Sequence, residues 1–526
     1  MRKLTLLIAL LLVAGLALVA CGGATPEQVA EEAAEVVGEE VVATAEAVVE
    51  EMAPTVEAAA EEVMATEEPA AEEPAAEEVM ATEEPAAEEP AAEEATGDKT
   101  VVRWFIGLGT GGNEQQLAVQ EAVVAAFNEA NPDIELQMEV VQNEVAYDTL
   151  ATLIASGDAP DIVGPVGTNG ANSFPTSWLD LAPLVESTGY DLSQFPAASV
   201  DFYRTADGGL SGLPFAVFPA MIFYNRDLFD EAGLAYPPHE VGEAYVMPDG
   251  TEMPWNFDTL AEVAKLLTVD ANGNDATSPD FDPENVIQWG YTDQWIQETR
   301  ALCNPFGAAS LEEDGQAVWP ESYEECIQWT YKAIWEDHFY PNAAQEASEL
   351  LATPNVFGSG NVGMAQTHLW FTCCIVGAPV TNWDMAVVPT NAAGVTTSKL
   401  HADTYRIMNT TEHPEEAFRA LTYLIGEAAP ELTVAYGALP VREAEQADFF
   451  AAKDVDYPQG VDWSIVNKML AYPDIPSHEN FLPSYQEAVV RMQAHLTLLK
   501  TEAGLDLQEV TDTFIADMQA IYDAAE

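Results

Sequence analysis

The sequence predicts an exported α/β protein of two lobes, preceded by a long unfolded tether. Three observations indicate this fold class: an apolar N-terminal segment, an acidic low-complexity stretch that ends at residue 98, and an alternation of strand-like and helical segments from Val101 onward. The roughly 428 residues from 99 to 526 exceed what one hydrophobic core usually organises, so we expect two lobes.

The N-terminal segment has the pattern of a secretory signal peptide. Arg2 and Lys3 precede an apolar run over residues 4–19, which is shorter than the roughly 20 residues of a membrane span. The run ends in Leu18-Val19-Ala20-Cys21, which resembles the lipobox of bacterial lipoproteins. This resemblance implies cleavage of residues 1–20 and a lipid on the Cys21 thiol, and an ordinary signal peptide with a chance cysteine is the alternative. Gly22 and not Asp follows, so a double-membraned cell would find no obvious inner-membrane retention cue. A lipidated Cys21 would make this an extracytoplasmic protein anchored to the outer face of the cell membrane.

Residues 21–98 differ in composition from everything that follows. They hold 25 Asp and Glu and no Lys or Arg, and the 16 residues 61–76 recur unchanged at 77–92. High charge without aromatic residues leaves little surface to bury, which predicts an unfolded, self-repelling spacer. An acidic run that binds a basic partner is the alternative interpretation.

The charge of residues 99–526 excludes several classes of partner. This part carries 64 acidic and 15 basic residues within a chain of net charge −72. Phosphate contacts need clustered Lys and Arg, so the balance excludes nucleic acid as a partner and argues against anionic lipid surfaces. It argues more weakly against a strongly anionic ligand.

The elements from Val101 onward follow a βαβ rhythm. A strand-like run at 101–106 ends in the glycine-rich turn 107–112, and a helical pattern over 114–128 stops before Asn131-Pro132. A strand at 134–141, a helix at 147–155 and a short strand at 161–163 follow. This alternation predicts a parallel sheet.

The rest of the chain continues the mixed pattern. Residues 287–291 are strand-like, and Pro, Gly, Asn and Asp mark residues 236–255 and 270–282 as surface loops. Further helices are predicted at 260–267, 323–334, 415–425 and 485–499.

Four cysteines follow Cys21, and an exported context permits disulfides. They are Cys303, Cys326, Cys373 and Cys374, for which three pairings are possible. A bond between adjacent Cys373 and Cys374 would close a strained ring, so we expect each of them to pair with Cys303 or Cys326. No C-x-x-C spacing or partner histidine indicates zinc, so these cysteines are interpreted as structural.

Four stretches of the chain, in order and spacing, resemble the extracellular solute-binding proteins of the sugar-binding family that includes maltose-binding protein. They are Phe127-Asn128-Glu129-Ala130-Asn131-Pro132 with Ser156-Gly157-Asp158-Ala159-Pro160-Asp161; Gly212-Leu213-Pro214-Phe215 with Phe223-Tyr224-Asn225-Arg226-Asp227; Phe357 to Met364 with Trp370 and Trp383-Asp384; and Pro414 to Phe418 with Tyr436-Gly437-Ala438-Leu439-Pro440. Together they span roughly residues 100–445.

The resemblance implies a periplasmic-binding-protein type II fold, in which two α/β lobes are joined at a hinge and enclose a cleft. One lobe would hold about 99–215 and 386–440, and the other about 216–385 and 441–526. Two departures put nearby contacts in doubt: the segment 236–255 looks like an insertion, and Cys373-Cys374 is unusual.

The function that the resemblance implies is capture of a solute for the permease subunits of an ABC importer. The ligand would be a carbohydrate, a neutral mono- or oligosaccharide, and the protein would act as a monomer. A receptor of the same fold that serves a sensor kinase is one alternative, and a surface glycosidase or lyase is the other.

Sugar capture has a recognisable chemistry, because pyranose faces stack on aromatic rings and hydroxyls bond planar polar groups. By resemblance, Trp370 presents a ring to the sugar, and Tyr436 near the hinge is either a ligand contact or structural. Four further segments place candidates at strand ends: Asn113 in the glycine-rich turn, Asn169, Phe218 with core packing as its rival, and Gln294 with Trp295.

No catalytic pattern supports an enzyme. The sequence lacks Gly-x-Ser-x-Gly, His-Glu-x-x-His and Gly-x-x-x-x-Gly-Lys motifs. Residues 270–275 hint at a calcium loop, but Gly273 stands fourth and Phe281 occupies the twelfth place, so a polar turn is the better interpretation. The seven histidines show no ligand spacing. We therefore predict no catalytic residues, no metal and no cofactor.

Overall fold

The computed structural model describes residues 99–205 and 208–525. The predictions for the signal peptide, for Cys21 and for the acidic tether fall on residues 1–98 and lie outside the described residues.

The described chain is built around one mixed sheet. Its main path runs in the order β2-β1-β3-β13-β4-β11-β8-β7, with β12 and β14 also paired to β4. The strands are β1 (Thr100–Ile106), β2 (Ile134–Val140), β3 (Ile162–Val166), β4 (Leu213–Asn225), β7 (Val269–Asp270), β8 (Val286–Asp293), β11 (Val362–His368), β12 (Trp383–Ala386), β13 (Leu400–Ile407) and β14 (Leu439–Pro440). β1 pairs in parallel with both β2 and β3, which confirms the predicted βαβ start.

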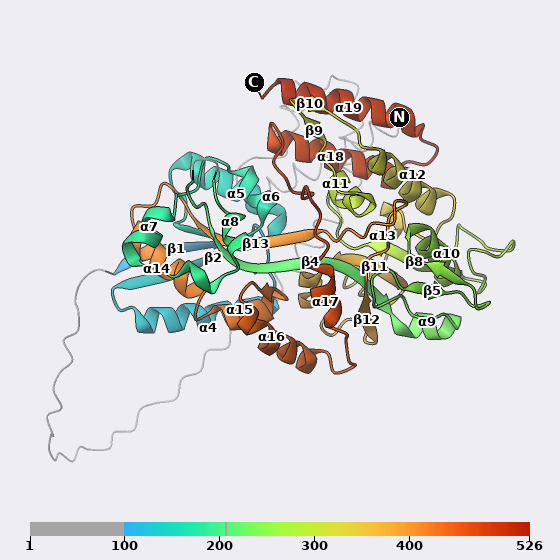
Figure 1. The fold of residues 1–526 in the computed structure, drawn as a ribbon, viewed down its shortest axis with the longest axis horizontal. Coiled ribbons are helices and arrows are strands. Elements are labelled where there is room, and N and C mark those ends of the chain that lie inside the picture. The colour runs from blue at the N-terminus through green and yellow to red at the C-terminus, as the bar shows by residue number, and fades with distance from the viewer. Residues whose placement is uncertain (1–98, 206–207, 526) are drawn as a thin grey trace, which may run out of the picture. The chain divides into compact units, whose positions relative to one another are not determined.

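β4 joins the two halves of this sheet. Its residues from Leu213 to Pro219 pair antiparallel with β13, and those from Ala220 to Asn225 pair with β11 and β12. Figure 1 shows β4 and β13 side by side through the middle of the ribbon, with the remaining strands fanning out to each side. The sheet is therefore one surface with two lobes built on it.

Helices cover the half of the sheet that holds β1, β2 and β3. They are α4 (Glu114–Ala130), α5 (Asn143–Ser156), α6 (Thr168–Ser173), α7 (Ala182–Thr188), η1 (Leu192–Gln194), α8 (Ala197–Asp201), α14 (Pro414–Leu424), α15 (Ala429–Tyr436) and α16 (Glu443–Asp456). The helix ends follow local chemistry. α5 stops at Gly157, whose φ of 77° suits glycine, and α14 begins with Pro414 at its first turn.

A second set of helices covers the half that holds β8 and β11. They are α9 (Arg226–Ala232), α10 (Phe257–Leu267), α11 (Thr299–Cys303), η2 (Asn304–Phe306), α12 (Glu321–Trp335), α13 (Ala343–Glu346), η3 (Leu369–Cys373), α17 (Ser464–Met469), α18 (Tyr485–Thr501) and α19 (Leu507–Asp523). α10 buries Leu260, Val263, Ala264 and Leu267, which recur at helical spacing on one face.

The buried apolar side chains form three clusters. The largest runs along the sheet through both halves and includes Trp104, Phe223 and Trp383. A second cluster lies among α11, α12, α18 and α19, and a third lies between α5 and the strands β1 and β3. The core is therefore continuous along the sheet, and α18 and α19 pack in a separate layer (Figure 1).

The predicted surface loops contain little regular structure. Residues 236–255 carry a small hairpin of β5 (Ala244–Val246) and β6 (Glu252–Pro254), and a second hairpin pairs β9 (Glu312–Glu313) with β10 (Gln316–Ala317). In the loop after β7, the Asp270 carboxylate accepts hydrogen bonds from the backbone N–H groups of Asn272, Asn274 and Asp282. Its oxygens therefore organise a polar turn.

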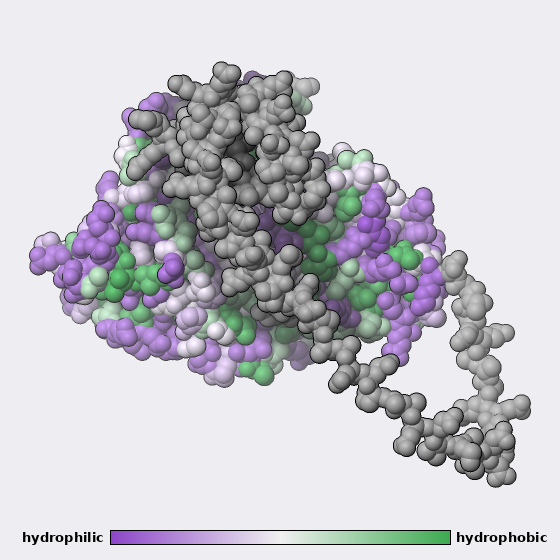
Figure 2. All heavy atoms as spheres, turned by 180° about the vertical axis from the view of Figure 1, so that it is seen from behind, coloured by the Kyte–Doolittle hydropathy of each residue, from purple (hydrophilic) through white to green (hydrophobic). Residues whose placement is uncertain are grey.

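Hydrophilic side chains dominate the outer margins of the face in Figure 2, and apolar side chains lie between them in small groups. This distribution agrees with the acidic composition of the chain. Among the helices of residues 99–205 and 208–525, none combines the length and the apolar character needed to cross a bilayer.

The disulfide prediction is wrong. Cys303 bonds to Cys326, with their Cα atoms 5.3 Å apart, and Cys373 bonds to Cys374. Cys303 ends α11 and Cys326 lies on α12, and both side chains are buried in the same apolar cluster. Packing of α11 on α12 decides the first pair, which leaves the two adjacent cysteines to each other.

We expect the Cys303–Cys326 bond to contribute strongly to stability, because it closes a loop with a sequence separation of 23. Replacing both cysteines by Ala should lower the free energy of unfolding by about 3 kcal/mol, measured by urea denaturation. The matched control replaces Cys373 and Cys374 by Ala, which opens no loop of comparable length. Equal losses in the two double variants would contradict the assignment.

Candidate binding pocket

A pocket opens where strands from both halves of the sheet end. Its lining comes from the segments that follow β3 and β8, from the end of β11, from η3, from the start of β13, and from the segment before α18. The lining residues are Asn169, Gln294, Trp295, Ile296, Gln297, Glu298, Arg300, Ala301, Thr367, His368, Trp370, Lys399, His401, His478, Glu479, Tyr485 and Val489. Open α/β sheets usually bind ligands at such strand ends.

Strand pairing explains why these residues meet. β11 runs parallel to β8 with Gln366 beside Asp293, so Gln294 and His368 leave the sheet at the same edge. On the two sides of β4, His368 pairs with Ala220 and His401 pairs with Phe218. β4 thus holds residues from β11 and β13 only a few ångströms apart.

Two tryptophans form an aromatic wall of the pocket. The rings of Trp295 and Trp370 are stacked, with centroids 5.9 Å apart and an interplanar angle of 13°. Trp295 is 47% exposed and has a φ of 55°, a left-handed conformation that large side chains rarely adopt. Backbone strain of this kind concentrates at functional sites, and here it holds an aromatic face at the pocket.

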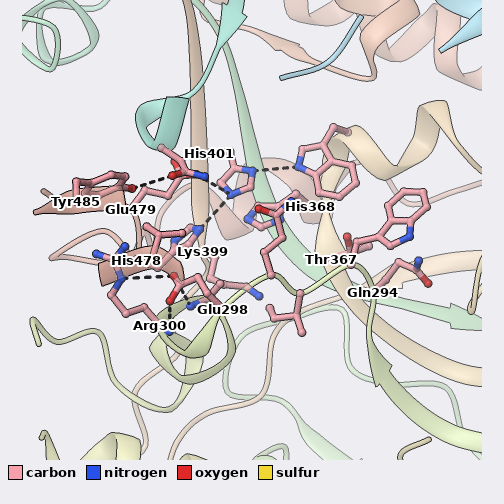
Figure 3. A pocket seen from close by; sticks show the side chains of 17 residues that line it. Gln294, Glu298, Arg300, Thr367, His368, Lys399, His401, His478, Glu479 and Tyr485 are labelled. Atoms are coloured by element: carbon pink, nitrogen blue, oxygen red, sulfur yellow. Dashed lines mark hydrogen bonds and ion pairs between the residues drawn. The ribbon is translucent and has the colours of Figure 1, made fainter. Parts of the chain in front are cut away.

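Three histidines lie beside this wall. The rings of His368 and His401 are stacked with centroids 3.8 Å apart, and His401 Nε2 lies 3.0 Å from His478 Nε2. Trp370 Nε1 donates to His401 Nδ1 at 3.1 Å, and His478 Nδ1 lies 2.7 Å from Asp474 Oδ2. Figure 3 shows the three imidazoles gathered around one point of the pocket.

Burial controls the charge of these groups. Burial, and then the charges of neighbouring histidines and Lys399, lower the pKa of His368 and of His401 well below the ordinary value, so both rings are neutral near pH 7. Burial also opposes ionisation of Asp474, but the charge and hydrogen bonds of His478 outweigh it and hold the pKa of Asp474 at about 2.

Charged side chains also line the pocket. The Arg300 guanidinium donates to the Asn480 carbonyl at 2.8 Å, and its Nε lies 3.4 Å from Glu298 Oε1. Lys399 is 1% exposed, and burial lowers the pKa of its ammonium group. The charges of Asp293, Asp474 and Glu298 raise this pKa, but by less than burial lowers it. Burial also raises the pKa of Glu479.

Several buried polar atoms of the lining have no hydrogen-bond partner within residues 99–205 and 208–525. They are Gln294 Nε2, Arg300 Nε, Thr367 Oγ1, His368 Nε2 and Glu479 Oε2. An unpaired buried donor or acceptor costs about 1–3 kcal/mol, so natural proteins rarely leave several together. Their concentration at one pocket indicates a site that a polar ligand completes.

Four of the seven predicted ligand residues lie together in this pocket: Asn169, Gln294, Trp295 and Trp370. Gln294 also uses its side-chain carbonyl, which accepts from Phe357 N–H at 2.9 Å. Asn169 accepts from the Tyr485 hydroxyl at 3.0 Å. The structure therefore brings these four side chains to one place, and their contact with a ligand stays a prediction.

The other three predicted residues lie elsewhere. Phe218 is 1% exposed and Tyr436 is 0% exposed, so both pack in the core and neither lines the pocket. The Tyr436 hydroxyl accepts from Gln120 Nε2 at 2.9 Å, which ties α15 to α4. Asn113 is exposed, and its amide lies 3.4 Å from the Cys374 sulfur.

Sequence reasoning missed the charged lining residues and all three histidines. His368, His401 and His478 are separated by 33 and 77 residues along the chain, a spacing that carries no metal or catalytic signature. One available signal was position, because His368 ends a strand and directly precedes the region of Trp370. The spacing of the histidines therefore gave no indication of this cluster.

A second buried carboxylate lies near the pocket, on β13. Asp403 is flanked by Gly109 and Gly167, at each of which a Cβ atom would come within 3.3 Å of the carboxylate oxygens. Burial, and then the charge of Glu479, raise the pKa of Asp403 to about 8. These glycines leave room for the Asp403 carboxyl group near Glu479.

A fold of two lobes on a shared sheet, with an aromatic and polar pocket at the strand ends, defines the class of solute-binding proteins. The chain belongs to the bacterial extracellular solute-binding protein family, whose family model matches residues 110–429. The predicted family is therefore confirmed. A binding protein of Brucella abortus (strain 2308) is 26% identical over 331 residues, which cover 62% of this chain and 73% of the relative.

Solved structures show the same fold. The ABC substrate-binding protein Lmo0181 from Listeria monocytogenes, in complex with cycloalternan, has a TM-score of 0.64 at 18% identity and covers 80% of this chain and 99% of its own. Maltose-bound MalE3 of T. maritima has a TM-score of 0.60 at 16% identity, and the match covers 81% of this chain and 100% of that protein. The predicted two-lobed fold is confirmed by these likenesses.

The raised pKa of Asp403 predicts a pH-dependent stability. The folded state keeps the Asp403 proton up to about pH 8, whereas the unfolded chain loses it near about pH 3.9, so folded-state stability falls as pH rises between these values. Between pH 6 and pH 8 this proton should cost the wild-type protein on the order of 2 kcal/mol of its free energy of unfolding, measured by urea denaturation. Asp403→Asn should not show this loss.

Asp133 provides the control for this prediction. A hydrogen bond from Arg419 holds the pKa of this exposed carboxyl below its usual range, so it is ionised in both states at pH 6–8. Asp133→Asn should keep the wild-type slope. The same slope in Asp403→Asn would contradict the assignment.

Proposed function

We propose that this protein is the extracytoplasmic solute-binding lipoprotein of an ABC importer and that it binds a carbohydrate in the pocket beside Trp295 and Trp370. The observation that carries the proposal is the pairing of an aromatic wall with unsatisfied hydrogen-bonding groups in one pocket. A sugar presents apolar ring faces together with hydroxyl groups, and each hydroxyl can both donate and accept. The sugar ligands of similar folds support this ligand class.

The pocket supports binding without chemical conversion. Neutral His368 and His401 and the hydrogen-bonded Arg300 and Asn169 are suited to holding hydroxyl groups. Family membership supports the same conclusion, because the family is one of solute-binding proteins.

Binding would be accompanied by movement of the lobes. The cavity holds about 70 Å³, well below the roughly 300–1,000 Å³ of pockets that enclose drug-sized ligands. A sugar therefore enters when the lobes separate, and contacts to both lobes then favour the closed form. The exchange of partners along β4 supports a hinge at Pro219–Ala220, four residues beyond the first lobe boundary that the sequence predicts.

The partners in this proposal are the permease subunits and the membrane. A lipid on Cys21 would anchor the chain, and a tether of about 77 residues would reach roughly 50 Å as a flexible coil. That reach would let a monomeric receptor search the surface around its permease and deliver the sugar in the closed form.

The carbohydrate proposal predicts a stabilising sugar. In a thermal-shift screen of sugars, polyols, amino acids and peptides, a ligand at 100 times its Kd should add about 2.7 kcal/mol to the folded state. Trp370→Ala should weaken the affinity for that sugar about tenfold, measured by calorimetry, because an aromatic stacking surface is lost.

Trp335 on α12 serves as the matched control, because its indole N–H donates to the Leu499 carbonyl and its ring does not line the pocket. Trp335→Ala should leave affinity unchanged at a temperature where the variant is folded. Stabilisation by peptides or amino acids alone would overturn the carbohydrate assignment.

The lipoprotein part of the proposal is tested separately. In the native host, Cys21→Ser should remove lipid labelling and release the protein from the membrane fraction, whereas Gly23→Ala should leave both unchanged. Membrane association of the Cys21→Ser variant would show that the thiol is not the anchor.

A further inference from the structure

The histidine cluster has a geometry that sugar binding does not require. One ring nitrogen from each of His368, His401 and His478 can be chosen so that all lie within 4.8 Å of one another. His368 is 5% exposed and its Nε2 has no partner among the described residues, and His478 is 2% exposed. Three convergent imidazoles, one with an unpaired nitrogen, form a set of metal ligands.

We propose that His368, His401 and His478 bind a divalent transition-metal ion, such as Zn²⁺, at the inner end of the pocket. Zinc bonds to imidazole nitrogen at about 2.0–2.1 Å, which places tetrahedral ligand nitrogens roughly 3.3 Å apart. The 3.0 Å between His401 Nε2 and His478 Nε2 is close to that spacing. All three nitrogens lie within 4.8 Å of one another, so the third needs to move by about 1.5 Å at most.

His478 is already prepared as a ligand. Its Nδ1 donates to Asp474 Oδ2 at 2.7 Å, which leaves the Nε2 lone pair facing His401. Asp474 is itself held by Asn304 Nδ2 at 2.9 Å and by the backbone N–H of His478 at 2.7 Å. A carboxylate that orients a ligating histidine in this way is a common outer partner in zinc sites.

The charges around the cluster are mixed. Lys399 lies close enough to act electrostatically on His368 and His401, and its positive charge opposes a cation. Glu479 Oε1 lies 3.6 Å from His401 Nε2 and Asp474 Oδ2 lies 2.7 Å from His478 Nδ1, so two carboxyl groups stand beside the cluster together with the lysine. Glu479 and the three histidines line the same pocket, so a Glu479 oxygen or an oxygen of a bound ligand could supply a fourth metal ligand.

Metal binding is coupled to Trp370 through the tautomer of His401. Trp370 Nε1 is only a donor, so His401 Nδ1 accepts its hydrogen bond and His401 carries its proton on Nε2. A metal on Nε2 moves that proton to Nδ1, where it faces the indole N–H. The metal therefore breaks the bond between Trp370 and His401, and the aromatic wall shifts.

The test uses the purified mature chain with Zn²⁺ in calorimetry and Co²⁺ in visible absorption. We expect one tightly bound ion per chain, an absorption typical of tetrahedral cobalt, and a change in tryptophan fluorescence. His478→Ala and His368→Ala should each weaken binding at least about a hundredfold, and Asp474→Asn about 10–100-fold. His413→Gln, a partly exposed histidine at the start of α14, is the control and should bind as wild type.

Trp370→Phe separates the proposal from misfolding. This variant removes the opposing indole donor, so it should bind metal at least as tightly as wild type while losing the fluorescence change. Zinc binding that survives both histidine variants would come from the acidic surface and would overturn the proposal, as would the absence of binding. A sugar should still stabilise the folded protein in the presence of a metal chelator if only the metal proposal is wrong.

Discussion

The buried strand β4 is the constraint on which the rest of the structure depends. Of its residues Leu213–Asn225 only Val217 is partly exposed, and they are nearly all apolar, as expected for a strand covered on both faces. Its first half pairs with β13 and its second half with β11 and β12. Because β13 and β11 flank β4 around Phe218–Ala220, His401 and His368 are brought together there, and the pocket forms beside them.

The pocket is polar in a place where burial makes polarity costly. Lys399 is 1% exposed, and Gln294 and His368 keep polar atoms without partners among the described residues. Such groups destabilise the folded state unless a ligand meets them. The large apolar core along the sheet offsets this cost, which lets the protein hold an incomplete hydrogen-bonding site ready for a solute.

Local sequence patterns predicted the helices and strands well, because hydrophobic periodicity and helix-terminating residues act over a few neighbouring positions. The helix over 114–128 and the strand at 101–106 match α4 and β1, and family resemblance with strand-end position found Trp370, Trp295, Gln294 and Asn169. Phe218 and Tyr436 pack in the core, which is the alternative that the sequence left open for each, because pairing partners that are distant in sequence decide whether an aromatic residue near a crossing faces the core or the cleft. The disulfides were misassigned for the same reason, since contact between α11 and α12 decides them.

By itself the sequence determined the two-lobed α/β fold, the family and the aromatic part of the pocket, because hydrophobic periodicity and short motifs are encoded over a few neighbouring residues. Only the tertiary structure decided which polar groups meet. His368, His401 and the pair Asp474 and His478 come from three separate segments, and Asp474 Oδ1 ties its segment to β13 by accepting the backbone N–H of Leu400 at 2.9 Å. Spacing along the chain carries no trace of that cluster, since strand register and not sequence distance sets the contacts between strands.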